Sequence, residues 1–266
     1  MAACQQLRST SLPLRPHALV QELDDELQRL RSCAAASSAS PCPTSLAARL
    51  GDAYGRIEEL VQLPGGRDAL SSARWCRAVE SALDASVSAL DLCERARDAA
   101  ASAKQHARGA RRAVRRGGDA ALARAALRGY ARCLANAGKH AAAGARKKKV
   151  AIRRAPAAND DAAAPPAALR VMSEAVAVTA AVLQRAMASL SARVVGARKS
   201  RWCAVARLLG VGGDWSLGAC RDLDGEDAQE MLRELEESVE AVESGLEHLF
   251  RHIVQSRVAL LNVLTL

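Results

Sequence analysis

Two histidines near the C-terminus have the spacing that comes nearest to a reactive site. His248 and His252 are four residues apart, so a helix places both imidazoles on one face, with Glu243 and Glu247 nearby. Imidazole and carboxylate groups bind zinc, but the metalloprotease helix has a glutamate directly after its first histidine, where this chain has Leu249. Two histidines alone make an incomplete metal site. We expect them to flank the core of a helical bundle or to face solvent.

No other residue type is arranged for catalysis. No serine lies in a G-x-S-x-G turn, and no cysteine has a histidine partner in its sequence context. The cysteines form no C-x-x-C pair, which disfavours structural zinc, and in so long a chain buried reduced thiols are favoured over a disulfide framework. The sequence therefore predicts a protein that is not an enzyme and uses no cofactor. The cysteines are Cys4, Cys33, Cys42, Cys76, Cys93, Cys133, Cys203 and Cys220.

One short motif near the N-terminus is suited to regulation. Arg8 and Pro13 flank Ser11 in the R-S-x-S-x-P pattern, whose phosphorylated second serine is bound by arginine clusters in readers of the 14-3-3 type. Phosphorylation would add about −1.5 to −2 charge to this segment. The alternative is an extended arm that packs Leu12 and Leu14 on the rest of the protein. We expect Ser11 to be a phosphorylation site.

Positive charge is concentrated in the middle of the chain, although the net charge is +9. Residues 95–154 contain 18 Lys or Arg and two acids, whereas residues 222–251 contain 11 acids and two arginines. Either the basic segment binds an anionic partner, or the acidic segment neutralises it within the fold. The candidate anion-binding residues are Arg111, Arg112, Arg115, Arg116, Arg146, Lys147, Lys148 and Lys149.

Nucleic acid is the least favoured of the anionic partners. Tyr130 is the only aromatic residue in the basic segment, so side chains on which bases could stack are missing. No helix-turn-helix, zinc-finger or RNA-binding-sheet motif accompanies the charge. An acidic protein or an anionic membrane surface fits the segment better.

The composition predicts that helices position these residues. Only six residues are aromatic, so the core must be made largely of Leu, Val and Ala. Alanine is the strongest helix former, whereas sheets favour β-branched and aromatic residues. Glycine and proline cluster in a few places and leave long uninterrupted stretches between them. We therefore expect an all-α fold, an elongated bundle of about six helices.

Turn residues and apolar spacing predict the helix boundaries. Pro16 suits the first position of a helix, and residues 64–66 (PGG) are expected to end the second helix. A third helix is predicted to begin near Ser71 and to weaken after Arg97. A fourth helix is predicted to fade within residues 138–144, where two glycines occur.

These boundaries predict four parts of the chain. Residues 1–16 form an extended arm, and residues 17–144 form the N-terminal helices of a bundle. Residues 145–166, rich in Lys, Arg, Ala and Pro, form a flexible linker. Residues 167–266 form the C-terminal helices of the same bundle, the first with an apolar stripe that starts at Leu169.

The clearest periodicity lies in the C-terminal helix. Ten positions alternate in steps of three and four, a heptad pattern that would extend over about 48 Å of helix. The helix could pair with a second copy of itself, but the other apolar helices favour a central place within one chain. The ten positions are Leu232, Leu235, Val239, Val242, Leu246, Leu249, Ile253, Ser256, Leu260 and Val263.

The sequence favours the cytoplasm over secretion or a membrane span. No apolar run approaches the roughly 18 to 20 residues that cross a bilayer, and the nearest is residues 175–183. A peripheral membrane location through the basic segment stays open. So does a nuclear location, because Arg146–Lys149 with Arg153 and Arg154 resembles a nuclear address.

Four segments together resemble one family. They are residues 8–17 (RSTSLPLRPH), 60–64 (LVQLP), 89–93 (ALDLC) and 249–265 (LFRHIVQSRVALLNVLT). These segments are similar to a plant-specific family related to the Bypass proteins, and the resemblance extends over nearly the whole chain. It implies a helical protein associated with root and shoot development, and it supplies no catalytic residue.

Residues and resemblance together lead to two expectations about function. The first is a non-enzymatic regulatory or adaptor protein that binds protein partners through exposed faces of its long helices. The alternative is a peripheral membrane protein that binds anionic lipid through residues 108–116 and 146–154.

Overall fold

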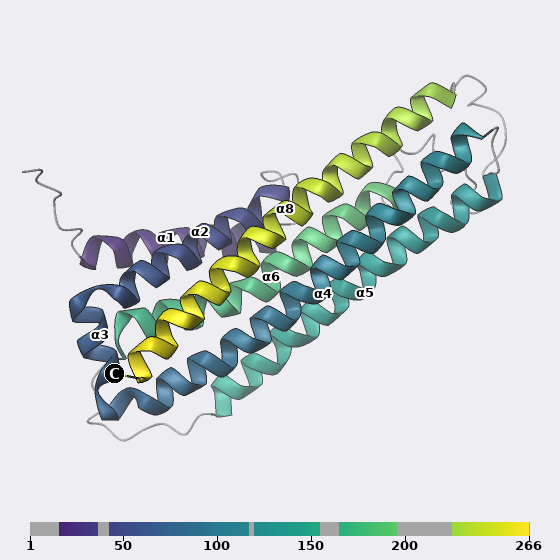
Figure 1. Ribbon diagram of the computed structural model, residues 1–266. Coiled ribbons are helices and arrows are strands. Elements are labelled where there is room, and N and C mark those ends of the chain that lie inside the picture. Colours follow the sequence, from purple (N-terminus) through teal and green to yellow (C-terminus); the bar gives the residue numbers. More distant parts are fainter. Residues whose placement is uncertain (1–15, 37–42, 117–119, 155–164, 196–224, 266) are drawn as a thin grey trace, which may run out of the picture.

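The computed structural model describes residues 16–36, 43–116, 120–154, 165–195 and 225–265 (Figure 1). Side chains are described for these ranges except at residues 16–17, 43–44, 120, 145–154, 195 and 225–227. The described residues form seven α-helices and one 3-10 turn, with no strand, which confirms the all-α fold. The elements are α1 Pro16–Ala35, α2 Pro43–Gln62, α3 Pro64–Ser71, η1 Ala73–Trp75, α4 Cys76–Arg115, α5 Ala120–Arg154, α6 Ala167–Val195 and α8 Gly225–Leu264.

The long helices α4, α5, α6 and α8 lie side by side, and α1 and α2 cover part of their length (Figure 1). Helix α6 is central, since it contacts α1, α2, α4 and α5, and α8 packs on both α2 and α4. Helix α5 packs on α4 and α6 at an edge of the bundle. Helices from both halves of the chain thus share one hydrophobic core.

The heptad of the C-terminal helix is confirmed as a buried stripe. All ten predicted positions are buried, from Leu232 to Val263, and none is more than 4 % exposed. The residues that cover them belong mainly to α2 and α4 of the same chain. Helix α8 therefore uses its apolar stripe inside one bundle, as its sequence favoured, and the stripe is not available for a second copy.

Helix α4 is much longer than its leucine and valine pattern predicts. The large apolar residues become sparse after Arg97, as the sequence indicated, but the helix continues to Arg115. Its second half is held by alanines, which recur at helical spacing and are almost fully buried. Alanines let two backbones approach closely and keep dispersion contacts dense. These buried alanines are Ala96, Ala99, Ala100, Ala103, Ala107, Ala110 and Ala113.

Helix α5 also continues beyond its predicted end. It passes through Gly138 and Gly144 and ends at Arg154, so residues 145–154, predicted to be linker, are helical. Both glycines lie where a neighbouring helix is close. A Cβ at Gly144 would be 3.1 Å from Leu92 Cδ1 of α4, and one at Gly138 would be 3.7 Å from Met187 Cβ of α6. Neither glycine ends the helix, and Gly144 allows α5 to pack closely on α4.

Helix α2 ends just before the PGG segment, as expected, and the same segment begins another helix. Helix α2 ends at Gln62, and Pro64 occupies the first turn of the short helix α3, where a missing backbone N–H costs nothing. Leu70 of α3 is fully buried. The third long helix then begins at Cys76, after η1, and not near Ser71.

Helix α6 is more apolar than the run of residues 175–183 suggested. Its segment Ala167–Val194 is long and apolar enough to cross a membrane, with a mean hydropathy of 1.4 in its most apolar window. However, 56 % of that window is buried within the bundle, as in the core helix of a soluble protein. The apolar stripe predicted from Leu169 onward accounts for this burial.

Candidate functional site

The basic side chains of α4 meet the acidic side chains of α8. The two helices are antiparallel, so Arg97 lies beside Glu247 at one end and Arg111 beside Glu236 at the other. Between these pairs, the Lys104 Nζ is 2.9 Å from a Glu243 oxygen and 3.2 Å from one of Glu240. The hydrogen bonds that Lys104 donates to Glu243 and Glu240 raise the pKa of the lysine. Part of the basic segment is thus neutralised within the fold.

Glu236 is the most buried member of this ladder of ion pairs between α4 and α8. Its side chain is 8 % exposed, with Arg111 Nε at 3.2 Å and Arg108 Nε at 3.6 Å. These distances make ion pairs, but Glu236 Oε1 has no hydrogen-bond partner among the described residues. Arg111, one of the predicted anion-binding residues, is therefore already engaged by an internal carboxylate.

The eight predicted anion-binding residues do not come together. Residues 111–116 lie at the end of α4, beside the start of α5, whereas residues 146–149 lie 26 or more positions further along α5. A helix rises 1.5 Å per residue, so about 39 Å separates the two groups. The side chains of Arg112, Arg115 and Arg116 are exposed. No single anion site is formed by the predicted set.

A basic face of α5 was missed by the sequence analysis. Arg124, Arg128, Arg132 and Lys139 follow one another at intervals of four, four and seven residues, which places them on one side of the helix. Arg128, Arg132 and Lys139 are exposed and Arg124 is half-buried. Within the described part of the chain none of the four forms an ion pair. The signal was present in the sequence as a spacing within the predicted fourth helix, but the charges were counted as one basic segment and not by helix face.

His248 and His252 lie in the seam between α8 and α2, where glycines leave room for their rings. A Cβ at Gly51 would be 2.5 Å from His248 Cδ2, and one at Gly55 would be 3.1 Å from His252 Nδ1. The His248 Nε2 is 2.8 Å from Asp52 Oδ1, and the two rings meet edge to face at 4.5 Å. The described residues contain no group of three or more metal ligands. The pair flanks the core.

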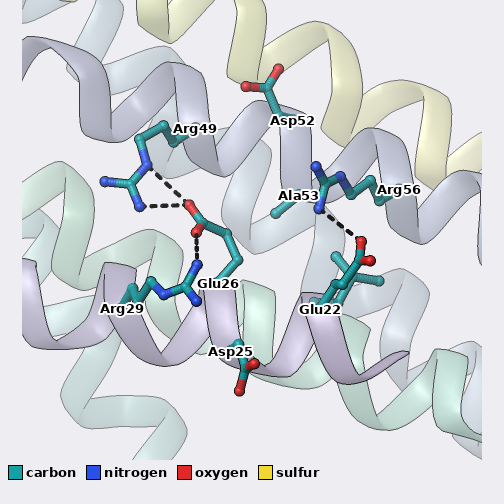
Figure 2. Close-up of a pocket in the computed structure, with 9 residues that line it drawn as sticks. Glu22, Asp25, Glu26, Arg29, Arg49, Asp52, Ala53 and Arg56 are labelled. Atoms are coloured by element: carbon teal, nitrogen blue, oxygen red, sulfur yellow. Dashed lines mark hydrogen bonds and ion pairs between the residues drawn. The ribbon is translucent and has the colours of Figure 1, made fainter. Parts of the chain in front are cut away.

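A polar hollow of about 340 Å³ lies between α1 and α2 (Figure 2). Its charged side chains pair with one another, since Arg49 Nε donates to Glu26 Oε1 at 2.9 Å and Arg29 lies 3.5 Å from the other oxygen. Arg56 and Glu22 lie 3.7 Å apart at the other end. Carboxylates held by arginines are poor general bases, and no nucleophile lines the hollow. The arrangement joins α1 to α2.

The buried groups that could act as nucleophiles are held in inert environments. Burial raises the pKa of the Cys93 thiol to about 12, and its Sγ lies 3.5 Å from the Leu246 carbonyl. Burial likewise raises the pKa of Tyr54, whose hydroxyl lies 3.0 Å from Thr179 Oγ1. A thiol is reactive as a thiolate, so Cys93 is a core residue.

Some predicted features lie outside the described residues. Ser11, Arg8 and Pro13 belong to residues 1–15, so the phosphorylation motif stays a prediction. Among the described cysteines, Cys33, Cys76, Cys93 and Cys133 are free thiols, as predicted.

The last turns of α8 present a second apolar face outward. Val254, Val258, Leu261 and Leu264 are 36–47 % exposed. Their spacing of four, three and three residues aligns them along one side of the helix. Arg257 lies at the edge of this face, three residues after Val254 and four before Leu261, and it fixes α8 to α4 because its guanidinium donates to the Leu83 carbonyl and to Ser86 Oγ. The outward apolar face is thus held on a fixed helix.

Comparison with known proteins identifies the family. The family model described as Protein BPS1 matches residues 47–263, from within α2 almost to the end of α8. Comparisons with curated proteins and with solved structures gave no match. The matched range contains Val254, Val258 and Leu261 of the outward apolar face of α8 and agrees with the resemblance to a Bypass-related plant family. This chain therefore belongs to the Protein BPS1 family.

Proposed function

We propose that the protein is a non-enzymatic adaptor that binds a protein partner through the outward face of α8. Membership in the Protein BPS1 family points to a plant regulatory protein of development. The adaptor role, and a role in root and shoot development, are our proposals beyond what family membership supports. The outward apolar face of α8 is the observation that carries the adaptor role.

An amphipathic helix binds an apolar surface through residues at i, i+3, i+4 and i+7. Val254, Val258 and Leu261 have the complementary spacing. Residues 250–265 contain no acid, and the exposed Arg251 lies at the start of the face. The proposed partner is therefore an amphipathic helix with an apolar stripe and an acidic flank.

The interior of the bundle supports surface binding over catalysis. The polar hollow between α1 and α2 is occupied by arginine–carboxylate pairs, and Cys93 is buried with a raised pKa. A reaction needs a nucleophile, a base and a stabiliser within reach of one substrate. The described residues bring no such set together.

Binding can be tested with two matched double variants. V258S/L261S removes apolar side chains from the proposed face, whereas V87S/L122S removes two equally exposed apolar side chains from α4 and α5. Proteins captured from plant tissue by the wild type would be purified, and their affinity for each variant measured. Loss of two apolar contacts at an interface weakens binding by at least tenfold, at about 1.4 kcal/mol per factor of ten.

We expect V258S/L261S to keep its melting temperature and to lose the partner, while V87S/L122S retains it. Equal affinity of both variants for the captured partner would exclude this face. Sedimentation velocity tests whether a second copy of the protein binds this face instead. If the wild type were a dimer and V258S/L261S a monomer, the face would serve self-association and not an adaptor role.

A further inference from the structure

Helix α5 carries an unbalanced positive charge. It contains ten Lys or Arg and no Asp or Glu. Helix α4, which packs on it, uses Lys104, Arg108 and Arg111 to bind the glutamates of α8. Helix α6, its other neighbour, has a single acid, Glu174, which pairs with Arg31 of α1. The acids that neutralise the rest of the basic segment therefore do not reach α5.

The charge of α5 lies along one outward line. The exposed Arg128, Arg132 and Lys139 share a face, and the opposite face is buried against α4 and α6 through Leu127 and Leu134. From residue 124 to residue 139 the line extends over about 22 Å. Near the Lys139 end of this basic line, Asp91 of α4 lines a hollow together with His140 and Gly144 of α5.

The shape and chemistry of this face select among anionic partners. The exposed uncharged side chains between the charges are Ala125, Ala135 and Asn136, which offer little apolar area to a protein partner. Tyr130, the only aromatic residue of α5, is fully buried, so bases have nothing to stack on. A fluid lipid surface needs neither feature, because its headgroups rearrange to meet a straight row of cations.

We propose that the basic face of α5 (Arg124, Arg128, Arg132 and Lys139) docks the protein on the anionic surface of a membrane. The bundle lies along the membrane on this edge, and α8 lies on the other side of α4 (Figure 1). The outward apolar face of α8 belongs to a different helix, so membrane docking does not depend on the adaptor role. This assignment moves the membrane-binding surface from the end of α4, where Arg108 and Arg111 are engaged, to α5.

The test uses the full chain and sedimentation with phosphatidylcholine vesicles, with and without phosphatidylserine. R128Q/R132Q/K139Q removes three charges from the face. R67Q/R74Q/R77Q is the matched control, because it removes three exposed charges from α3, η1 and α4 and gives the same net charge. Glutamine favours helix nearly as well as arginine, so both variants should fold. Circular dichroism would check this.

Each Lys or Arg near an anionic surface contributes about 1 kcal/mol, so removing three lowers partitioning onto phosphatidylserine vesicles by roughly 100-fold. We expect that loss for R128Q/R132Q/K139Q, a change within about twofold for the control, and binding that weakens as salt is added. Failure of the wild type to bind these vesicles, or equal losses in both variants, would overturn the proposal. The proposal would also be overturned if the wild type bound duplex nucleic acid but not vesicles, and if R128Q/R132Q/K139Q lost that binding.

The vesicle-binding test and the partner-binding test can give independent results. V258S/L261S should still bind the vesicles, and R128Q/R132Q/K139Q should still bind the purified protein partner. If either variant lost both activities while still folded, the two surfaces would be one site and both assignments would need revision.

Discussion

Thr179 lies where α6 approaches α2, and its hydroxyl group makes two buried contacts. Its Oγ1 donates to the Ala175 carbonyl at 2.8 Å and accepts from the Tyr54 hydroxyl at 3.0 Å. Both side chains are fully buried. Leaving a buried hydroxyl without a partner costs more free energy than a hydrogen bond contributes on balance. Removing the Thr179 hydroxyl and removing the Tyr54 hydroxyl should therefore have different effects on stability.

We predict that Thr179→Val destabilises the protein more than Tyr54→Phe. The valine leaves the buried Tyr54 hydroxyl without an acceptor, at about 1–3 kcal/mol, whereas the phenylalanine removes one donor at about 0.5–1.5 kcal/mol. The double variant should lose less than the sum of the two. Urea unfolding of the four proteins measures this cycle. Additive losses would mean that the two hydroxyls do not interact.

His252 gives the bundle a dependence on pH. Burial and the neighbouring His248 lower the pKa of His252, whereas Asp52 and Glu58 oppose this. The neutral ring is therefore favoured in the folded protein, and the unfolded chain takes up the proton more readily. Stability from this group is complete above the unfolded value of about 6.5 and is lost as the pH falls below it.

We predict that His252→Gln flattens the loss of stability below about pH 6.5, because glutamine does not titrate. His140→Gln is the matched control, since His140 is exposed on α5. The urea midpoint measured across this pH range provides the comparison. If the midpoint of His252→Gln fell with pH as steeply as that of the wild type, His252 would not be the group responsible.

At the scale of the element, the seam between α2 and α8 depends on the missing side chain of Gly51. A Cβ there would be 2.5 Å from His248 Cδ2 and 3.2 Å from the backbone Cα of Leu249. The ring of His248 would have to move and give up its contact with Asp52. By contrast, a Cβ at Gly65, in the first turn of α3, would meet nothing within 4 Å.

We predict that Gly51→Ala lowers the free energy of unfolding by about 1–3 kcal/mol through overpacking. Gly65→Ala should be neutral or add about 0.4–1 kcal/mol, since it restricts the unfolded chain. Thermal and urea unfolding of both variants would show the difference. Equal stability of the two variants would indicate that α2 and α8 are not in such close contact.

The ladder between α4 and α8 gives a prediction about charge. R108Q/R111Q removes both cations from the buried Glu236 and should cost about 1–3 kcal/mol, whereas R112Q/R115Q, at exposed positions of the same helix, should cost little. Urea unfolding at neutral pH measures both. Equal losses in the two variants would show that Glu236 does not depend on these arginines.

Some elements follow from the sequence and others do not, for a physical reason. The stripe of α8 from Leu232 to Val263 was predictable because large apolar residues mark a buried face unambiguously. The second half of α4, and α5 beyond Leu134, pack mainly through alanines and glycines, which are too small to stand out from a polar surface pattern. The same small residues made α5 look like the start of a linker.

At the scale of the whole molecule, the candidate surfaces depend on which helices are neighbours. The sequence contained a basic and an acidic segment, but pairing Arg111 with Glu236 requires that α4 and α8 be antiparallel and adjacent. Once they are, α5 is left as the unneutralised edge. Tertiary arrangement, and not local pattern, decides which of the 18 basic residues of the middle segment face a partner.

The central claim is that function resides on the outer faces of one bundle and not in its interior. Rescue of development in a plant line that lacks this protein tests the claim most directly, by comparing V258S/L261S with Tyr54→Phe at equal protein levels. Our account predicts that Tyr54→Phe, which alters only the buried polar interior, restores development and that V258S/L261S does not. Rescue by V258S/L261S together with failure of a stably folded Tyr54→Phe would contradict it.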